Sequence, residues 1–209
     1  MLQPHDRILF IGDSVTNAFR MPQEVSSAYQ LGAGYTLLVA AHYQLGRPAD
    51  GLQFFNRGIS GNGVKDLENR WQDDCLALEP TVVSILIGVN ETICSFKGYS
   101  HLNDDQYEDC LNALVTSTKA ALLGVRLVLC EPFLTPTGSV TSEWVADIAG
   151  RGAAVRRVAA AHGAVCVPLQ QPFAEACALA PPEYWAFDGI HPTAAGFGII
   201  ARQWIQAVG

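Results

Sequence analysis

The chain has 209 residues, of which 49% are hydrophobic and 16% are charged, and its formal net charge is −7. This composition excludes an intrinsically disordered chain and favours a single globular domain, which we expect to span residues 1–209. The acidic charge and the lack of a Lys or Arg run argue against nucleic acid and anionic membrane surfaces as partners.

Apolar runs typical of buried strands alternate along the chain with stretches of helical periodicity. They predict, in chain order, a strand at 8–11, a polar loop at 15–32, a helix at 34–45, a strand at 52–56, a helix at 64–78, a strand at 81–87, a helix at 104–123, a strand at 125–130, a helix at 142–162, a strand at 164–167 and a helix at 193–208. On the helix at 34–45, the apolar spacing predicts one face made of Tyr35, Leu38, Val39 and His42.

The strict alternation of strand and helix predicts a parallel sheet, because parallel strands need crossover connections of about a dozen residues. Five such strands predict a three-layer α/β/α sandwich with a five-stranded, parallel, flavodoxin-like sheet. In that strand order a crevice opens between the first and third strands, at their carboxyl ends. Functional side chains should therefore lie just after the strands rather than along the helices.

Four short stretches meet this expectation. The residues Gly-Asp-Ser at 12–14 follow the first strand, GISGNG at 58–63 follows the second and GVNE at 88–91 follows the third. The residues DGIHP at 188–192 lie between the fifth strand and the last helix. All four should meet at one edge of the sheet.

Ser14 is predicted to be a catalytic nucleophile. A serine hydroxyl is weak until a base takes its proton and a third group orients that base. His191 is the candidate base, and Asp188, on the same turn, can reach its other ring nitrogen. The tetrahedral intermediate also needs donors for its oxyanion, and the N–H groups of Ser14 and Gly61 with the side-chain amide of Asn90 are suitable.

Each pattern alone also has a structural interpretation. Gly-Asp-Ser is a common tripeptide, the glycines at 58–63 can form a simple turn, and Asp-x-x-His can cap a helix. The glycines run GxxGxG after the second strand, the reverse of a dinucleotide fingerprint, and no P-loop Lys follows them. The four stretches together favour catalysis, whereas Asp13 is interpreted as a structural hydrogen-bonding residue.

These residues resemble the motifs of the SGNH or GDSL hydrolases, and the resemblance extends over nearly the whole chain. It implies a nucleophile at Ser14, a triad completed by Asp188 and His191, and an oxyanion hole that includes Gly61 and Asn90. It implies no cofactor.

Two positions depart from the pattern of that family. Val15 stands where the family name has Leu, and Glu91 replaces the Asp that often follows the asparagine, which leaves the role of Glu91 open. Within the family the chain is most similar to the acetylxylan esterases that act on xylo-oligosaccharides inside bacterial cells. The similar stretches are 9–16, 32–35, 56–62, 67–74, 83–92 and 186–196. This similarity implies removal of small acyl groups from a sugar.

Substrate recognition is less constrained by the sequence. Trp185 could offer a stacking wall for a sugar if the aromatic run at 184–187 is exposed, and it is a core residue otherwise. His101, in the loop after Asn90, is a second candidate contact. Two other functions stay open: hydrolysis of longer acyl chains on lysophospholipids or thioesters, and non-catalytic binding of carbohydrate. The polar loop at 15–32 does not suggest a long apolar groove.

The remaining signals concern metals, redox state and location. Six scattered cysteines without CxxC or Cys/His spacing predict free thiols and a reducing compartment. No histidine pair has metal-ligand spacing, so no metal is expected. The lack of a signal-peptide core and of a bilayer-spanning run predicts a cytoplasmic protein. A small acylated carbohydrate is the expected partner, and self-assembly into a homo-oligomer is left open.

Overall fold

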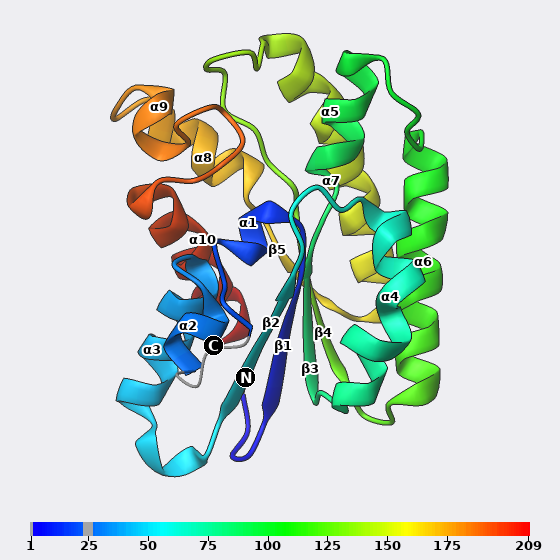
Figure 1. Ribbon diagram of the computed structural model, residues 1–209, viewed down its shortest axis with the longest axis vertical. Coiled ribbons are helices and arrows are strands. Elements are labelled where there is room, and N and C mark those ends of the chain that lie inside the picture. The colour runs from blue at the N-terminus through cyan, green and yellow to red at the C-terminus, as the bar shows by residue number, and fades with distance from the viewer. Residues whose placement is uncertain (1, 23–26) are drawn as a thin grey trace.

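A five-stranded sheet forms the centre of the computed structural model, which describes residues 2–22 and 27–209 (Figure 1). Its strands are β1 (Arg7–Gly12), β2 (Gln53–Gly58), β3 (Val82–Leu86), β4 (Arg126–Cys130) and β5 (Val165–Val167). They are ordered β2-β1-β3-β4-β5, and every neighbouring pair is parallel. The predicted α/β fold and its flavodoxin-like strand order are confirmed.

Helices cover both faces of the sheet. They are α1 (Ser14–Asn17), α2 (Ser27–Leu31), α3 (Tyr35–Gly46), α4 (Val64–Asp74), α5 (Val89–Lys97), α6 (Asp104–Ala121), α7 (Ser142–His162), α8 (Gln170–Cys177), α9 (Pro182–Trp185) and α10 (Ala194–Val208). Helices α3 and α10 lie on one face, and α4, α6 and α7 lie on the other (Figure 1). Short 3₁₀ turns at Pro48–Asp50 and Leu76–Leu78 complete the connections.

The strand side chains alternate between two apolar clusters, one under each helical layer. Ile8 and Phe10 belong to the cluster beneath α3 and α10, and Leu9 and Ile11 belong to the cluster beneath α4, α6 and α7. Trp204 of α10 is fully buried, and its indole N–H donates to the Ser84 hydroxyl at 2.9 Å. Both faces of the sheet are therefore sealed, which leaves its carboxyl edge to hold a site.

The ends of the three strands β1, β2 and β3 are level with one another. Gly12 pairs with Gly58 on one side and with Leu86 on the other. The segments that follow these strands therefore begin side by side. Figure 1 shows α1, which carries residue 14, directly above this edge.

Several predicted elements need correction. The predicted loop at 15–32 contains α1 and α2, and its residues 23–26 lie outside the described part of the chain. Helices α5, α8 and α9 were not predicted. On α3 the buried face is made of Tyr35, Val39 and Tyr43, which lie four residues apart, whereas Leu38 and His42 are exposed. The predicted face of that helix was correct at Tyr35 and Val39 but wrong at Leu38 and His42, because the buried stripe follows the i, i+4 row.

All six cysteines are free thiols, as the sequence predicted. In the described part of the chain, every helix is too short or too polar to span a bilayer.

Candidate active site

Ser14 is the first residue of α1 and follows β1 after a single intervening residue. That residue, Asp13, is 1% exposed, and one of its carboxylate oxygens accepts the N–H of Val15 at 2.9 Å. Asp13 thus caps the helix that carries the serine, in agreement with its predicted structural role. Burial raises the pKa of the Asp13 carboxyl to about 7, and the nearby charge of Glu91 adds to this shift.

The predicted nucleophile and base lie within hydrogen-bonding distance, although 177 positions separate them in the sequence. Ser14 Oγ lies 3.0 Å from His191 Nε2. On the other side of the imidazole ring, His191 Nδ1 lies 2.7 Å from Asp188 Oδ2. The second oxygen of Asp188 accepts the backbone N–H groups of Ile190 at 3.0 Å and His191 at 2.7 Å. This turn fixes the carboxylate and the ring relative to each other.

The electrostatics of Asp188 suit an acceptor for the imidazole. Partial burial alone would raise the pKa of its carboxyl. The hydrogen bonds from the backbone and ring of His191, and from the Ile190 N–H, outweigh that effect and hold the pKa below its ordinary value. Asp188 is therefore ionised at neutral pH and can accept a hydrogen bond from a protonated Nδ1 of His191.

A cavity of about 570 Å³ joins the predicted groups. Among its lining residues are Ser14, Gly61, Asn90, Asp188 and His191. The structure therefore brings together, in one cavity, the residues that the sequence predicted for the triad and the oxyanion hole.

Gly61, in the loop after β2, and Asn90, in the first turn of α5, line the cavity together with Ser14. Gly61 has φ +83°, a left-handed conformation that favours glycine, and open space surrounds its Cα. The Asn90 amide donates one hydrogen to the carbonyl of Asn62 at 2.9 Å, so the other hydrogen is free for a ligand. Within residues 2–22 and 27–209, neither the Ser14 N–H nor the Gly61 N–H has a hydrogen-bond acceptor. Three donors are thus available beside the hydroxyl.

The comparison with known proteins agrees with this geometry. The GDSL-like Lipase/Acylhydrolase family matches residues 10–199. The chain belongs to this family. A curated acetylxylan esterase of Geobacillus stearothermophilus is 34% identical to this GDSL hydrolase over 209 residues, which cover 98% of this chain and 94% of the relative.

Solved structures of related proteins share the whole fold. A putative GDSL-like lipase from Parabacteroides merdae superposes with a TM-score of 0.94 at 37% identity, covering 100% of this chain and 98% of that one. A mutant of an acetyl-xylooligosaccharide esterase from Geobacillus superposes with a TM-score of 0.92 at 32% identity, and the match covers 100% of this chain and 96% of that one. The GDSL hydrolase is accordingly a carboxylic ester hydrolase.

Phe19 lines the cavity that contains Ser14, and the sequence did not predict it there. Its ring is 91% exposed, and both Phe19 and the preceding Ala18 have positive φ values, of 60° and 43°. Hydrogen bonds hold this unusual backbone: the Asn17 side-chain oxygen accepts the Phe19 N–H at 3.1 Å, and the Ala18 carbonyl accepts the Ala33 N–H at 2.7 Å. Such conformations persist only where the surroundings impose them. No feature of the sequence signals one here.

Other cavity residues also escaped prediction. They are Asn17, Ala18, Ser60, Ile93, Lys97, Ser139 and Ile190. Ile93 and Lys97 belong to α5, which was not predicted, so their approach to the serine could not be inferred. A prediction of α5 from the spacing after Asn90 would have found them.

The two predicted substrate contacts lie outside the cavity that contains Ser14. Trp185 is partly buried against the core, its indole N–H faces the Ala180 carbonyl at 3.3 Å, and it lines a separate cavity of about 270 Å³. His101 lines another cavity of about 260 Å³, which shares Gly61 and Asn90 with the cavity that contains Ser14. Of the two alternatives that the sequence left open for Trp185, the packing favours the core residue, and His101 lies adjacent to the cavity that contains Ser14.

An exposed aromatic ring does lie beside the catalytic histidine candidate. Phe187 is 62% exposed, and its ring stacks on that of His191 with centroids 5.8 Å apart and planes 19° apart. Along this segment Trp185 packs against the core, whereas Phe187 is exposed. The described residues contain no cluster of three His, Cys, Asp or Glu side chains able to hold a metal ion.

Proposed function

We propose that this GDSL hydrolase is a serine esterase that removes small acyl groups, acetyl above all, from a carbohydrate. The observation that carries the proposal is the continuous contact from Ser14 through His191 to Asp188, which opens into a cavity beside free N–H donors. This arrangement meets the geometric requirements for acyl transfer to a serine.

The reaction follows from these positions. Ser14 Oγ attacks the ester carbonyl carbon while its proton passes to His191 Nε2, and Asp188 stabilises the imidazolium that forms. The N–H groups of Ser14 and Gly61, with the free amide hydrogen of Asn90, hold the oxyanion.

The tetrahedral intermediate then collapses to the acyl-enzyme. The bond to the sugar oxygen breaks, and His191 returns its proton to that oxygen as the alcohol leaves. Water repeats the sequence: it loses a proton to His191, attacks the acyl carbon and releases the carboxylic acid with Ser14 restored. No cofactor enters either half of the reaction.

The preference for a sugar acetate rests on two supports. The curated relative and a structural relative are described as an acetylxylan esterase and an acetyl-xylooligosaccharide esterase. Substitutions described as catalytic in the Geobacillus enzyme replace a serine, an aspartate and a histidine, the last two three residues apart, as Asp188 and His191 are here. The polar cavity residues Ser60, Ser139 and Lys97 also suit a hydroxylated leaving group better than an acyl tail.

A series of p-nitrophenyl esters with acyl chains of two to twelve carbons tests the substrate class. We expect kcat/KM to be highest for acetate and to fall with chain length, because a long acyl chain would be buried against the polar side chains of Ser60, Lys97 and Ser139. A maximum at eight carbons or more would instead support a lysophospholipase or thioesterase. Release of acetate from acetylated xylose and xylo-oligosaccharides then tests the sugar.

Ser14→Ala tests the nucleophile. We expect loss of turnover and of fluorophosphonate labelling, with a melting temperature within a few degrees of wild type, because the side chain is small and lies at the surface of the cavity. Wild-type protein that binds acetylated sugar but neither hydrolyses it nor reacts with the probe would support the non-catalytic alternative.

A further inference from the structure

We infer that Arg70 is a positioning residue that holds the oxyanion-hole loop, here residues 58–63, against the strand that leads to the nucleophile. The inference rests on the proposed roles of Gly61 and Asn90. Arg70 belongs to α4, which covers one face of the sheet, and its side chain points to the carboxyl edge of the sheet. Arg70 does not line the cavity that contains Ser14.

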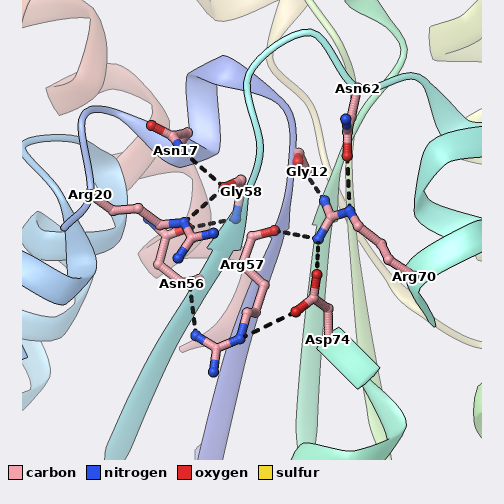
Figure 2. Close-up of polar contacts among 9 residues, drawn as sticks. All are labelled: Gly12, Asn17, Arg20, Asn56, Arg57, Gly58, Asn62, Arg70 and Asp74. Atoms are coloured by element: carbon pink, nitrogen blue, oxygen red, sulfur yellow. Dashed lines mark hydrogen bonds and ion pairs between the residues drawn. The ribbon is translucent and has the colours of Figure 1, made fainter. Parts of the chain in front are cut away.

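The guanidinium of Arg70 lies at the junction of three segments (Figure 2). Its Nε donates to Asn62 Oδ1 at 2.8 Å, its Nη1 to the carbonyl of Arg57 at 2.8 Å, and its Nη2 to the carbonyl of Gly12 at 3.1 Å. Gly12 ends β1, two residues before Ser14, and Arg57 lies at the end of β2. One side chain therefore joins both strand ends to the loop.

Asn62 transmits this contact to the oxyanion donors. It is the next residue after Gly61, so fixing its side chain limits the orientation of the Gly61 N–H. Its backbone carbonyl accepts the amide of Asn90 at 2.9 Å, while its side-chain oxygen accepts from Arg70. Gly61 and Asn90, the two donors outside α1, are thus both attached to a residue that Arg70 holds.

The charge of Arg70 is balanced locally. Asp74, one turn later on α4, accepts from Arg70 Nη1 at 2.8 Å, and the Arg70 side chain is only 15% exposed. A planar guanidinium presents its five donors in a fixed arrangement, whereas a lysine ammonium is a single point charge on a flexible stem. Lysine can keep the ion pair with Asp74 but cannot reach all the carbonyl and amide acceptors together.

Arg57 provides a matched control. Its guanidinium also lies beside Asp74, at 3.6 Å, and otherwise donates to the carbonyl of its own neighbour Asn56 at 3.3 Å (Figure 2). Only the backbone carbonyl of Arg57 contacts Arg70, and a side-chain substitution keeps that carbonyl. Arg57→Gln therefore removes a nearby cation without touching the loop.

The test compares Arg70→Lys, Arg70→Gln and Arg57→Gln with wild type and Ser14→Ala, using p-nitrophenyl acetate and thermal melting. Loss of one oxyanion donor costs about 10²–10³ in kcat where tested, so a displaced donor should cost about 10- to 100-fold. We expect that loss for both Arg70 variants, with KM within about threefold and Arg57→Gln within about twofold of wild type. A general loss of structure would instead lower the melting temperature and alter both parameters.

Asn62→Ala gives an independent measurement that leaves Arg70 and the strand ends intact. We expect a similar fall in kcat, and no further fall when it is combined with Arg70→Lys, because both changes break the same contact. Folded Arg70→Lys with wild-type kcat, or losses that multiply in the double variant, would overturn the inference. A wild type without Ser14-dependent turnover would overturn the proposed function instead, so the two failures are distinguishable.

Discussion

Asp13 combines two properties that oppose each other. Its carboxylate caps the helix that carries Ser14, yet it is almost fully buried, and Glu91 adds a second buried carboxyl nearby. Burial, reinforced by Glu91, raises the pKa of Asp13 to about 7, so the folded protein retains a proton that the unfolded chain releases. The folded protein is therefore most stable relative to the unfolded chain when this carboxyl is neutral, although the hydrogen bond from the Val15 N–H favours the ionised form.

We predict that Asp13 makes the protein less stable as pH rises. The carboxyl ionises near 3.8 in the unfolded chain and near 7 in the folded protein. The free energy of unfolding should therefore fall between these pH values, by up to about 4 kcal/mol, and stay lower above them. Asp13→Asn keeps an oxygen for the Val15 N–H but removes the titration.

Urea unfolding of both proteins across this pH range tests the prediction. The variant and wild type should have similar stability near pH 4, and the variant should be the more stable above pH 7. A wild-type stability that rises with pH relative to Asp13→Asn would contradict it.

At the scale of single residues, the sequence predicted the groups that local motifs reveal. Ser14 and the Asp188–His191 turn are recognisable because each motif sits at a predicted strand end or before a helix. Phe19 could not be found in this way, since its place depends on two left-handed residues held by a local hydrogen bond to Asn17 and by one from Ala33, farther along the chain. The inward packing of Trp185 likewise depends on α8 and α9, which were not predicted.

Among the elements, α4 depends on a partner from another part of the chain. Glu91 of α5 accepts the N–H of Val64, the first residue of α4, at 2.6 Å, and it is 5% exposed. Burial raises the pKa of Glu91, although the Val64 N–H and Arg151 oppose the shift. The glutamate that departs from the family pattern thus reaches across to start α4. This contact gives Glu91 a structural role that the sequence left open.

Glu91→Ala should lower the free energy of unfolding by about 1–3 kcal/mol, because it leaves a buried helix N–H without an acceptor. Asp66→Ala is the matched control: Asp66 accepts the neighbouring Gly63 N–H at 2.8 Å but is exposed, so water can replace it. Its loss should be smaller. Equal stability of the two variants in urea unfolding would show that Glu91 does not cap α4.

Elements with strong periodicity and clear caps were predicted well. Helix α7 has the predicted bounds and ends at Gly163, whose φ of 64° suits a helix C-terminus. Helix α6 begins where predicted, with Asn103 accepting the Gln106 N–H at 2.9 Å. Short helices such as α1 and α9 bury too few residues to show a period, so tertiary packing rather than local sequence determines them.

For the whole molecule, the strand order could be predicted from the need for crossover connections, and the two-sided core could be predicted from the continuous apolar strands.

Two buried thiols, one in each apolar cluster, can be used to detect unfolding of the core. Cys130 lies in the cluster beneath α3 and α10, and Cys75 lies in the one beneath α4, α6 and α7. Burial raises the pKa of each to about 12.

We predict that Cys75 and Cys130 are alkylated only when the whole protein unfolds, and at the same rate, because one sheet forms the floor of both clusters. The half-buried Cys94, Cys110, Cys166 and Cys177 should react earlier. Iodoacetamide labelling followed by peptide mass spectrometry, in increasing urea below the transition, measures each site. Much faster labelling of one buried thiol would mean that the layers unfold separately and that residues 1–209 are not one cooperative domain.

The turn that contains Asp188 and His191 has a kinetic consequence. Because Asp188 and His191 lie in one tight turn, motions of the rest of the fold change the distance between the carboxylate and the imidazole very little. Only the distance from that loop to Ser14 depends on distant parts of the chain. Thermal fluctuations should thus modulate reactivity along a single coordinate, the gap between the hydroxyl and the imidazole.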